Sequence, residues 1–304
     1  MKKTKFIWLN GKLVSWDDAK IHILTHTLHY GSGAFEGMRF YDSDNGSAIF
    51  RLKKHVERLI RSFSIFHSNL PWTQEEIEKA IYDTVKANLP ECKAGYIRPI
   101  VFHGYGIMGL KIRKESPVSM AIAVWPWGAY LGERPIKVKI TNIRRLSPKA
   151  FKADAKICGH YVNSILATTE ACNAGFDEAL MLDDKGNIAE GSGENIFAVK
   201  NSKLITPPLR GQILPGITRV SIIEVAKDLG YVVEERDVNV DELKDADEAF
   251  FTGTAAEVHP IGQIDDKLIG DGKIGKITSK LKQTFSEIVA GKNEKYRDWL
   301  TYVK

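Results

Sequence analysis

Ala155-Lys-Ile-Cys-Gly-His-Tyr161, or AKICGHY, is the first of four short segments that together decide how this chain is interpreted. The other three follow in the order AEGSGEN at 189–195, LPGITR at 214–219 and GTAAE at 253–257. All four combine small residues with polar side chains that can take part in chemistry. Each segment alone is a weak signal, but their order along one chain is informative.

The composition is that of an ordinary soluble globular protein. The chain has 304 residues, enough for two domains, of which 43% are apolar and 27% charged. Its formal net charge of +5 comes from basic residues spread among acidic ones, so electrostatics gives no case for a nucleic-acid partner. No segment approaches the roughly 20 apolar residues of a membrane span, and the apolar stretch 6–9 is too short for a signal peptide. Three cysteines (Cys92, Cys158 and Cys172) fit neither a disulfide framework nor a zinc site, which predicts a reduced, cytoplasmic setting.

The N-terminal half predicts a small α/β domain. Asn10-Gly11 lies between two apolar runs and supplies the positive φ angles of a tight hairpin turn. The spacing of apolar residues predicts a helix over 52–66, and Thr73-Gln-Glu-Glu76 is a capping box that begins another. Strands are expected at 95–103 and 117–125.

The segment 125–132 combines one proline, two glycines and three aromatic residues, which is typical of a connector. We therefore expect a small domain over 1–123, a connector over 124–134 and a larger domain over 135–304. The second half mixes many strands with a few helices, so the predicted fold class is α+β. The elements expected there are a strand at 136–140, helices over 161–172, 217–229 and 276–290, and hairpins around 184–187 and 201–202.

Three other patterns resemble known sites but lack essential parts. Residues 104–109 have the GxGxxG spacing of a dinucleotide-binding loop, yet no helix pattern or acidic ribose ligand follows, so we expect a glycine-rich loop. Residues 270–276 lack the Ser or Thr of a phosphate-binding loop and predict a surface turn.

His22, His26 and His29 have the spacing of one helix face that could hold zinc. The apolar residues among them predict buried packing instead, and these are Ile21, Ile23, Leu24 and Leu28.

Two of the four segments allow a chemical interpretation from their residues alone. Small and apolar neighbours, including Ala155 and Ile157, surround Lys156, which predicts a desolvated amine with a lowered pKa. In LPGITR a proline-glycine pair precedes a predicted helix. The first amides of that helix, at Ile217 and Thr218, would favour a phosphate dianion.

In this order the segments resemble the fold-type-IV pyridoxal-phosphate enzymes, the branched-chain aminotransferases and their relatives. The resemblance extends to the N-terminal half through HYGSGAFEGMR at 29–39, HVERL at 55–59 and YIRP at 96–99, so it covers nearly the whole chain. It implies a two-domain α+β fold with a small α/β N-terminal domain and a larger, strand-rich C-terminal domain that binds pyridoxal 5′-phosphate.

The resemblance also assigns roles to cofactor-binding residues. Lys156 would bind the cofactor covalently and act as the catalytic acid and base. Tyr161 would contact the 3′-oxygen of the cofactor, and Glu190 would face its pyridine nitrogen. The phosphate-binding set that the family pattern implies is Arg58, Ile217, Thr218 and Thr254.

The family pattern further implies an aromatic substrate pocket, which suits the side chains of Leu, Ile and Val. Arg98 with Tyr30 would accept the distal carboxylate of glutamate, and the amides of Ala255 and Ala256 would hold the α-carboxylate. The remaining substrate positions are Phe35, Tyr96, Trp127, Tyr130 and Leu110, the last reaching in from a partner subunit.

These residues predict a branched-chain amino-acid:2-oxoglutarate aminotransferase with a ping-pong mechanism. Its expected partners are small amino acids and 2-oxo acids and a second copy of the chain, in a homodimer or a larger oligomer built from dimers. No nucleic acid, membrane or metal is expected. Related alternatives are a D-amino-acid aminotransferase and an aminodeoxychorismate lyase, against which the aromatic set and Tyr96-Ile-Arg98 argue. A non-catalytic phosphate-binding protein is disfavoured because binding alone would not need Lys156.

Overall fold

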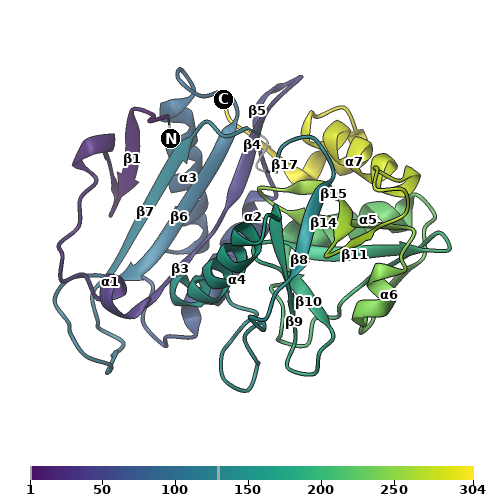
Figure 1. Cartoon of the computed structure of the whole chain (residues 1–304). Coiled ribbons are helices and arrows are strands. Elements are labelled where there is room, and N and C mark those ends of the chain that lie inside the picture. Colours follow the sequence, from purple (N-terminus) through teal and green to yellow (C-terminus); the bar gives the residue numbers. More distant parts are fainter. Residues whose placement is uncertain (1, 129–130) are drawn as a thin grey trace. The chain divides into compact units, whose positions relative to one another are not determined.

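The computed structural model describes residues 2–128 and 131–304 (Figure 1). The chain forms two compact units. The described part of unit 1 comprises 2–128, 155–160 and 288–304, and that of unit 2 comprises 131–154 and 161–287. Both units contain helices and strands, which confirms the predicted α+β class.

The two units are not continuous in sequence, unlike the expected domains 1–123 and 135–304. The segment 155–160 belongs to unit 1 because the Phe35 N–H donates to the Lys156 carbonyl at 3.1 Å. The segment 288–304 belongs there because strand β17 (Leu300–Tyr302) pairs with β5 (Gly46–Phe50). The expected domain boundaries therefore remain a prediction, and the compact units differ from them at these two segments.

Unit 1 is built on an antiparallel sheet in the order β17-β5-β4-β6-β7-β1-β2, with β3 paired to β6. Its other strands are β1 (Phe6–Leu9), β2 (Lys12–Ser15), β3 (Gly33–Phe35), β4 (Met38–Ser43), β6 (Gly95–His103) and β7 (Val118–Trp125). The hairpin β1–β2 confirms the turn prediction, since Asn10 and Gly11 both have positive φ angles, 47° and 97°.

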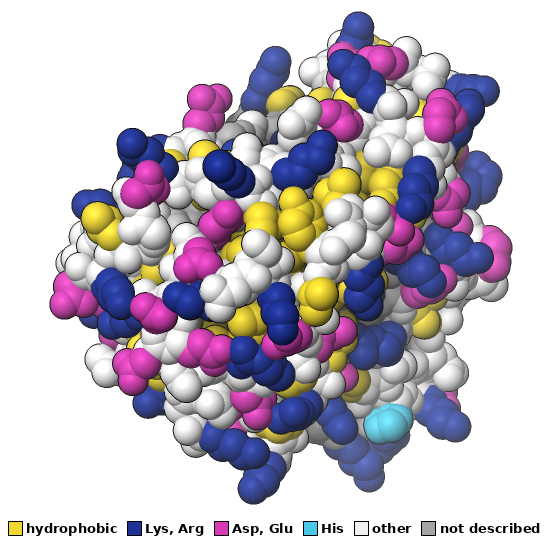
Figure 2. All heavy atoms as spheres, turned by 90° about the vertical axis from the view of Figure 1, so that its right-hand side faces the viewer, with side chains coloured by type: hydrophobic (Ala, Val, Ile, Leu, Met, Phe, Trp, Pro, Cys, Tyr) yellow, Lys and Arg dark blue, Asp and Glu magenta, His cyan; other side chains and the backbone are white. Residues whose placement is uncertain are grey.

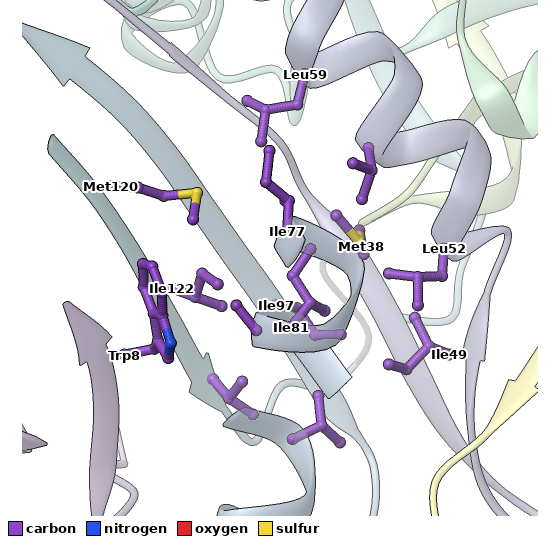
Figure 3. Close-up of a cluster of buried hydrophobic side chains, with 14 of the residues drawn as sticks. Trp8, Met38, Ile49, Leu52, Leu59, Ile77, Ile81, Ile97, Met120 and Ile122 are labelled. Carbon is purple, nitrogen blue, oxygen red and sulfur yellow. The ribbon is translucent and has the colours of Figure 1, made fainter. Parts of the chain in front are cut away.

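The core of unit 1 lies between this sheet and two helices, α2 (Leu52–Ser64) and α3 (Gln74–Asn88) (Figure 3). Leu59 of α2 and Ile77 of α3 are fully buried. Burying such a side chain contributes about 1.5–3 kcal/mol, so the apolar stripe of each helix fixes which face meets the sheet. The predicted capping box begins α3: the Glu76 N–H donates to the Thr73 hydroxyl at 3.2 Å, and the Thr73 N–H donates to the Glu76 carboxylate at 2.8 Å.

Three short helical turns and one short helix complete unit 1. They are η1 (Trp16–Asp18), α1 (His26–Tyr30), η2 (Cys158–His160) and η3 (Glu294–Trp299).

Unit 2 is built on a mixed sheet in the order β10-β9-β8-β15-β14-β11-β12-β13, with β16 paired to β15. The strands are β8 (Ile136–Ile140), β9 (Glu178–Leu182), β10 (Ile188–Gly191), β11 (Asn195–Lys200), β12 (Lys203–Thr206), β13 (Val233–Glu235), β14 (Glu248–Gly253), β15 (Glu257–Ile264) and β16 (Lys267–Leu268). The helices are α4 (Tyr161–Asn173), α5 (Ile217–Asp228), α6 (Val240–Lys244) and α7 (Lys276–Val289), whose end lies in unit 1. The helices predicted over 161–172, 217–229 and 276–290 and both predicted hairpins are thereby confirmed.

The two glycine-rich patterns adopt the structures expected of them. Residues 104–117, between β6 and β7, contain no helix, which removes the dinucleotide-binding interpretation of the GxGxxG spacing. Residues 270–275 form a turn that follows the exposed two-residue strand β16 and leads into α7.

The histidine stretch was predicted to be buried packing, and this is wrong for most of it. Ile23 is 72% exposed, and Ile21, Leu24 and Leu28 are also exposed. The helix α1 has only five residues and begins at His26, so His22 does not share a helix face with His26 and His29. Of the three histidines, His26 alone is buried. Its Nδ1 lies 2.6 Å from the Ser32 hydroxyl and its Nε2 lies 2.8 Å from the Gly109 carbonyl. Apolar composition predicted burial here, but this segment runs along the surface of unit 1.

Charge and hydropathy agree with the composition. Basic and acidic side chains are interspersed on the face in Figure 2. Among the residues that the structure describes, no helix is both long and apolar enough to cross a membrane, and no His, Cys, Asp and Glu side chains cluster as metal ligands.

Candidate active site

In unit 1, Lys156 is fixed by its backbone between a strand and a helix. Its carbonyl accepts from Phe35 at the end of β3, and its N–H donates to the Ser62 hydroxyl of α2 at 3.0 Å. Ala34 and Ile157 form a single antiparallel bridge beside it. The amine Nζ lies 4.9 Å from the centre of the Phe35 ring. The backbone of this lysine therefore cannot move without disturbing both β3 and α2.

The surroundings of Lys156 make its amine easier to deprotonate than that of an ordinary lysine, as its sequence neighbours predict. Burial, and then the positive charge of Arg58, lower the pKa of Lys156 to about 8 from its ordinary 10.5. Glu36 and Tyr96 oppose this effect, and Arg98 adds to it. At pH 7 about a tenth of the lysine is then neutral, against fewer than about one in a thousand for an ordinary lysine.

Arg58 is held by a buried carboxylate that the sequence analysis did not single out. The Glu36 side chain is completely buried and accepts from Arg58 Nε at 2.5 Å and Nη2 at 2.9 Å. Its Oε2 atom also lies 2.7 Å from Nδ1 of His55. Burial alone would raise the pKa of Glu36, but Arg58 and His55 lower it well below its usual range. Burial lowers the pKa of His55.

An aromatic group surrounds Arg98, and we define it as Phe35, Tyr96, Trp125 and Trp127. The Arg98 guanidinium lies 4.8 Å from the Phe35 ring centre and 5.2 Å from that of Tyr96. The rings also contact one another, with Tyr96 4.4 Å from Trp127 and 5.1 Å from Trp125. The buried Nε of Arg98 has no hydrogen-bond partner among the described residues. The structure thus brings together three of the predicted substrate residues and Arg98, and adds Trp125.

The other predicted substrate residues of the N-terminal half are more exposed. Tyr30 ends α1 and is 43% exposed, and Leu110 is 85% exposed on the loop between β6 and β7. Tyr130 lies outside the described residues.

In unit 2, Glu190 is a buried strand residue. It lies on β10 and accepts from Arg145 Nε at 2.6 Å and from Asn195 Nδ2 at 3.0 Å. The backbone N–H of Leu214 donates to the same carboxylate at 3.1 Å. These donors stabilise the anionic form of the carboxylate and hold it in one orientation.

The start of α5 has no side-chain cap, which suits the anion site that the sequence predicts. Its N-cap residue Gly216 provides no side-chain acceptor for the first amides of the helix. A Cβ atom at Gly216 would lie 2.0 Å from Asn195 Oδ1, so the close approach requires glycine. Ile217 and Thr218 open the helix and are buried, and the helix dipole favours an anion there.

The remaining predicted residues of unit 2 lie at chain reversals. Tyr161 is the first residue of α4 and is half-buried. Thr254, Ala255 and Ala256 form the tight turn between β14 and β15, with Ala256 buried.

Each unit, taken by itself, has residues that fit a part of pyridoxal 5′-phosphate. Unit 1 offers an amine with a lowered pKa and an oriented guanidinium, and unit 2 offers a hydrogen-bonded carboxylate and a helix start without a side-chain cap. An amine suits an aldehyde, a carboxylate suits a protonated pyridine nitrogen, and a guanidinium or a helix start suits a phosphate.

Several supporting residues had been missed. Glu36 and His55 lie inside the quoted segments, and a buried carboxylate near an arginine could have been suspected. The sequence around Arg145 does not indicate a role for it. Its partner Glu190 lies 45 residues later in the chain and comes close to it only because β10 pairs with β9. Asn195 closes AEGSGEN, and its Nδ2 also donates to the Leu214 carbonyl at 3.0 Å, which joins two of the four segments.

Comparison with known proteins gives consistent matches over nearly the whole chain. The family model described as amino-transferase class IV matches residues 33–264. The branched-chain-amino-acid aminotransferase of Pseudomonas aeruginosa is 45% identical over 302 residues, which cover 98% of this chain and 97% of that protein. The crystal structure of the Escherichia coli branched-chain amino acid aminotransferase has a TM-score of 0.96 at 39% identity, covering 99% of this chain and 100% of that one. The T.th. branched-chain amino acid aminotransferase, solved with pyridoxamine 5′-phosphate, has a TM-score of 0.96 at 42% identity and 100% coverage of both chains.

Proposed function

The chain belongs to the class IV aminotransferases, and from this premise we propose that it transfers the amino group of leucine, isoleucine or valine to 2-oxoglutarate. The observation that carries the proposal is the Lys156 amine, whose pKa is lowered to about 8 and which lies over Phe35 of the aromatic group. The relatives named as branched-chain enzymes support the substrate class. The T.th. enzyme was also solved with N-(5′-phosphopyridoxyl)-L-glutamate, which supports glutamate and 2-oxoglutarate as the second pair of substrates.

Pyridoxal 5′-phosphate supplies, when bound, a ring that withdraws electrons from the substrate Cα. We propose that Lys156 Nζ removes the proton from this Cα as a neutral amine. Glu190 holds a proton on the pyridine nitrogen through its negative charge. Arg58, Ile217, Thr218 and Thr254 bind the phosphate, and Tyr161 donates to the 3′-oxygen.

For the substrate we propose two kinds of contact within one ping-pong cycle. The aromatic group packs against a branched side chain, while Arg98, with Tyr30, binds the distal carboxylate of glutamate. The amides of Ala255 and Ala256 hold the α-carboxylate, and Tyr130 completes the pocket. We also propose the cytoplasmic setting that cysteine usage predicted.

A half-reaction tests the proposed function directly. The purified protein should convert its bound cofactor from the pyridoxal to the pyridoxamine form when L-leucine is added without an acceptor. Adding 2-oxoglutarate should then restore the pyridoxal form with release of L-glutamate. Absorbance spectra follow both steps, with D-leucine as the control. Conversion by D-leucine but not L-leucine would rule out the proposed substrate class.

The charge of Arg98 should matter for glutamate and 2-oxoglutarate and much less for leucine. We expect Arg98→Ala to raise KM for glutamate and 2-oxoglutarate at least tenfold, and KM for leucine less than threefold. The reason is that a γ-carboxylate can form charge-assisted hydrogen bonds to the half-buried guanidinium of Arg98, and an isobutyl group cannot. Steady-state kinetics with each substrate varied in turn measures the difference.

Arg98→Lys is the matched control for this prediction. It keeps the positive charge but loses the planar pair of donors, so its KM for glutamate should lie between those of the parent and the alanine variant. Equal losses for leucine and glutamate in Arg98→Ala would mean that Arg98 orders the aromatic group instead of binding substrate.

We propose further that the loop 104–110 contacts a second copy of the chain and that the active unit is a homodimer or a larger oligomer. Tyr105, Met108 and Leu110 are 59%, 54% and 85% exposed. Such apolar side chains are costly on a monomer and suit burial against a partner.

The second prediction tests this shared pocket by mixing two inactive variants, Lys156→Ala and Leu110→Asp. A mixed dimer would contain one pocket with an intact lysine and an intact partner loop, so activity should recover to about a quarter of the parent after subunit exchange, following random pairing. Each variant exchanged with itself is the control. Absence of recovery despite exchange detected by mass spectrometry would place the loop in its own subunit's pocket.

A further inference from the structure

A single carboxylate connects both functional groups of unit 1. Glu36 follows Phe35, whose N–H binds the Lys156 carbonyl, and it accepts two hydrogen bonds from Arg58. Its own N–H donates to the Pro99 carbonyl of β6 at 2.9 Å, so its backbone is fixed by the sheet. Glu36 is therefore held by β6 on one side and holds a helix residue on the other.

The geometry of the Arg58 pair is bidentate. Nε donates to Oε1 and Nη2 donates to Oε2, so the plane of the guanidinium is set by the plane of the carboxylate. His55, one turn earlier on α2, holds Oε2 from the other side. An ionised carboxylate only accepts, so His55 donates from Nδ1. These contacts determine the direction in which Arg58 presents its remaining N–H groups.

We propose that Glu36 is a positioning residue for the reaction: its carboxylate fixes the plane of Arg58, and its negative charge offsets that of Arg58 beside the Lys156 amine. The inference rests on the proposed roles of Arg58 and Lys156. It assigns a role to a completely buried residue that acts through Arg58. The groups with the largest electrostatic effect on Lys156 are Arg58, Glu36, Tyr96 and Arg98, and His55 and Cys158 also interact with its charge.

Glu36→Gln tests both parts of the proposal, the orientation of Arg58 and the effect of the negative charge on Lys156. For each part, the change that we expect has the opposite sign to the change expected if that part is wrong. A glutamine cannot accept from Arg58 and His55 with both of its polar atoms, so the guanidinium loses its orientation and cofactor binding should weaken at least tenfold. Loss of the negative charge alone would instead strengthen phosphate binding. The variant should also lower the pKa of Lys156 below its parent value of about 8. A general loosening would raise that pKa, because burial is the largest cause of its depression.

Two measurements on the full chain freed of cofactor give these readouts. Equilibrium titration with pyridoxal 5′-phosphate gives the affinity. The pH dependence of Lys156 labelling by trinitrobenzenesulfonate, quantified by peptide mass spectrometry, gives the pKa of the amine. Glu57→Gln is the matched control, since Glu57 precedes Arg58 on the same helix and only forms a surface pair with Lys54 among the described residues. It should change neither value.

Glu36→Asp carries the test if the glutamine variant does not fold. It keeps the charge, so Lys156 should titrate as in the parent. Its shorter side chain cannot span both Arg58 and His55, so cofactor binding should weaken. Parent-like cofactor affinity in either variant, or a raised Lys156 pKa in Glu36→Gln, would overturn the inference. If the cofactor of the parent were attached to another lysine, the proposed function itself would fail instead.

Discussion

Lys156→Ala should reduce turnover by about 10⁴-fold or more, since no other group is proposed to move the proton at the substrate Cα. The amine it removes is the one whose pKa burial and Arg58 lower to about 8. The phosphate-binding residues remain, so the variant should still bind pyridoxal 5′-phosphate, though without a covalent bond. A coupled assay with leucine and 2-oxoglutarate measures the loss, and the absorbance spectrum reports the bound cofactor.

Lys152→Ala is the control for this prediction. Lys152 lies four residues earlier and is exposed, so its loss should leave turnover unchanged. Borohydride reduction of the parent followed by peptide mapping should place the cofactor on Lys156. Attachment to any other lysine would show that the roles proposed for unit 1 are wrong.

Glu190→Gln should slow kcat by about 10²–10³-fold while the protein stays folded. A neutral amide no longer keeps the pyridine nitrogen protonated, so the negative charge that develops at Cα in the transition state is stabilised less in the variant than in the parent. The three donors around the carboxylate engage both oxygens, and an amide nitrogen at either position would face one of them. Steady-state kinetics, with circular dichroism as the check on folding, measures the effect.

Glu178→Gln provides a matched control on the strand paired with β10. Burial raises the pKa of Glu178, and its three hydrogen bonds, from Thr168, Ser192 and the Ala179 N–H, all reach Oε1. A glutamine can keep that oxygen as its carbonyl, so kcat should change less than threefold. Equal kcat values in Glu190→Gln and the parent would exclude the proposed role of Glu190. Equal losses in both glutamine variants would make the effect structural.

The elements that could be predicted from the sequence are those whose causes are local. Asn10-Gly11 selects its turn, and Thr73 with Glu76 caps a helix whose apolar stripe is evident from spacing. The lowered pKa of Lys156 was also predictable in direction, because its apolar neighbours indicated burial. The second cause, the charge of Arg58, is nonlocal and became visible when α2 was placed beside β3.

What could not be predicted depends on contacts between distant segments. Glu36 meets His55 and Arg58 because α2 packs beside the turn after β3, and no periodicity encodes that meeting. Ile23 is exposed although the apolar composition of its segment predicts burial, because burial depends on which other parts of the chain cover a residue. Strand β17 has three residues, too few for an alternation pattern to predict its pairing with β5.

The pairing of β17 with β5 also constrains the order of events during synthesis. Strands β1 to β7 leave the ribosome first, but the edge beyond β5 stays open until Leu300–Tyr302 emerge, after every residue of unit 2. The Lys156 segment likewise joins its sheet only once the chain has been made as far as Ile157, well after the end of β7. An N-terminal unit that would ordinarily fold first is thus completed last, and one edge of β5 stays unpaired until β17 has been made.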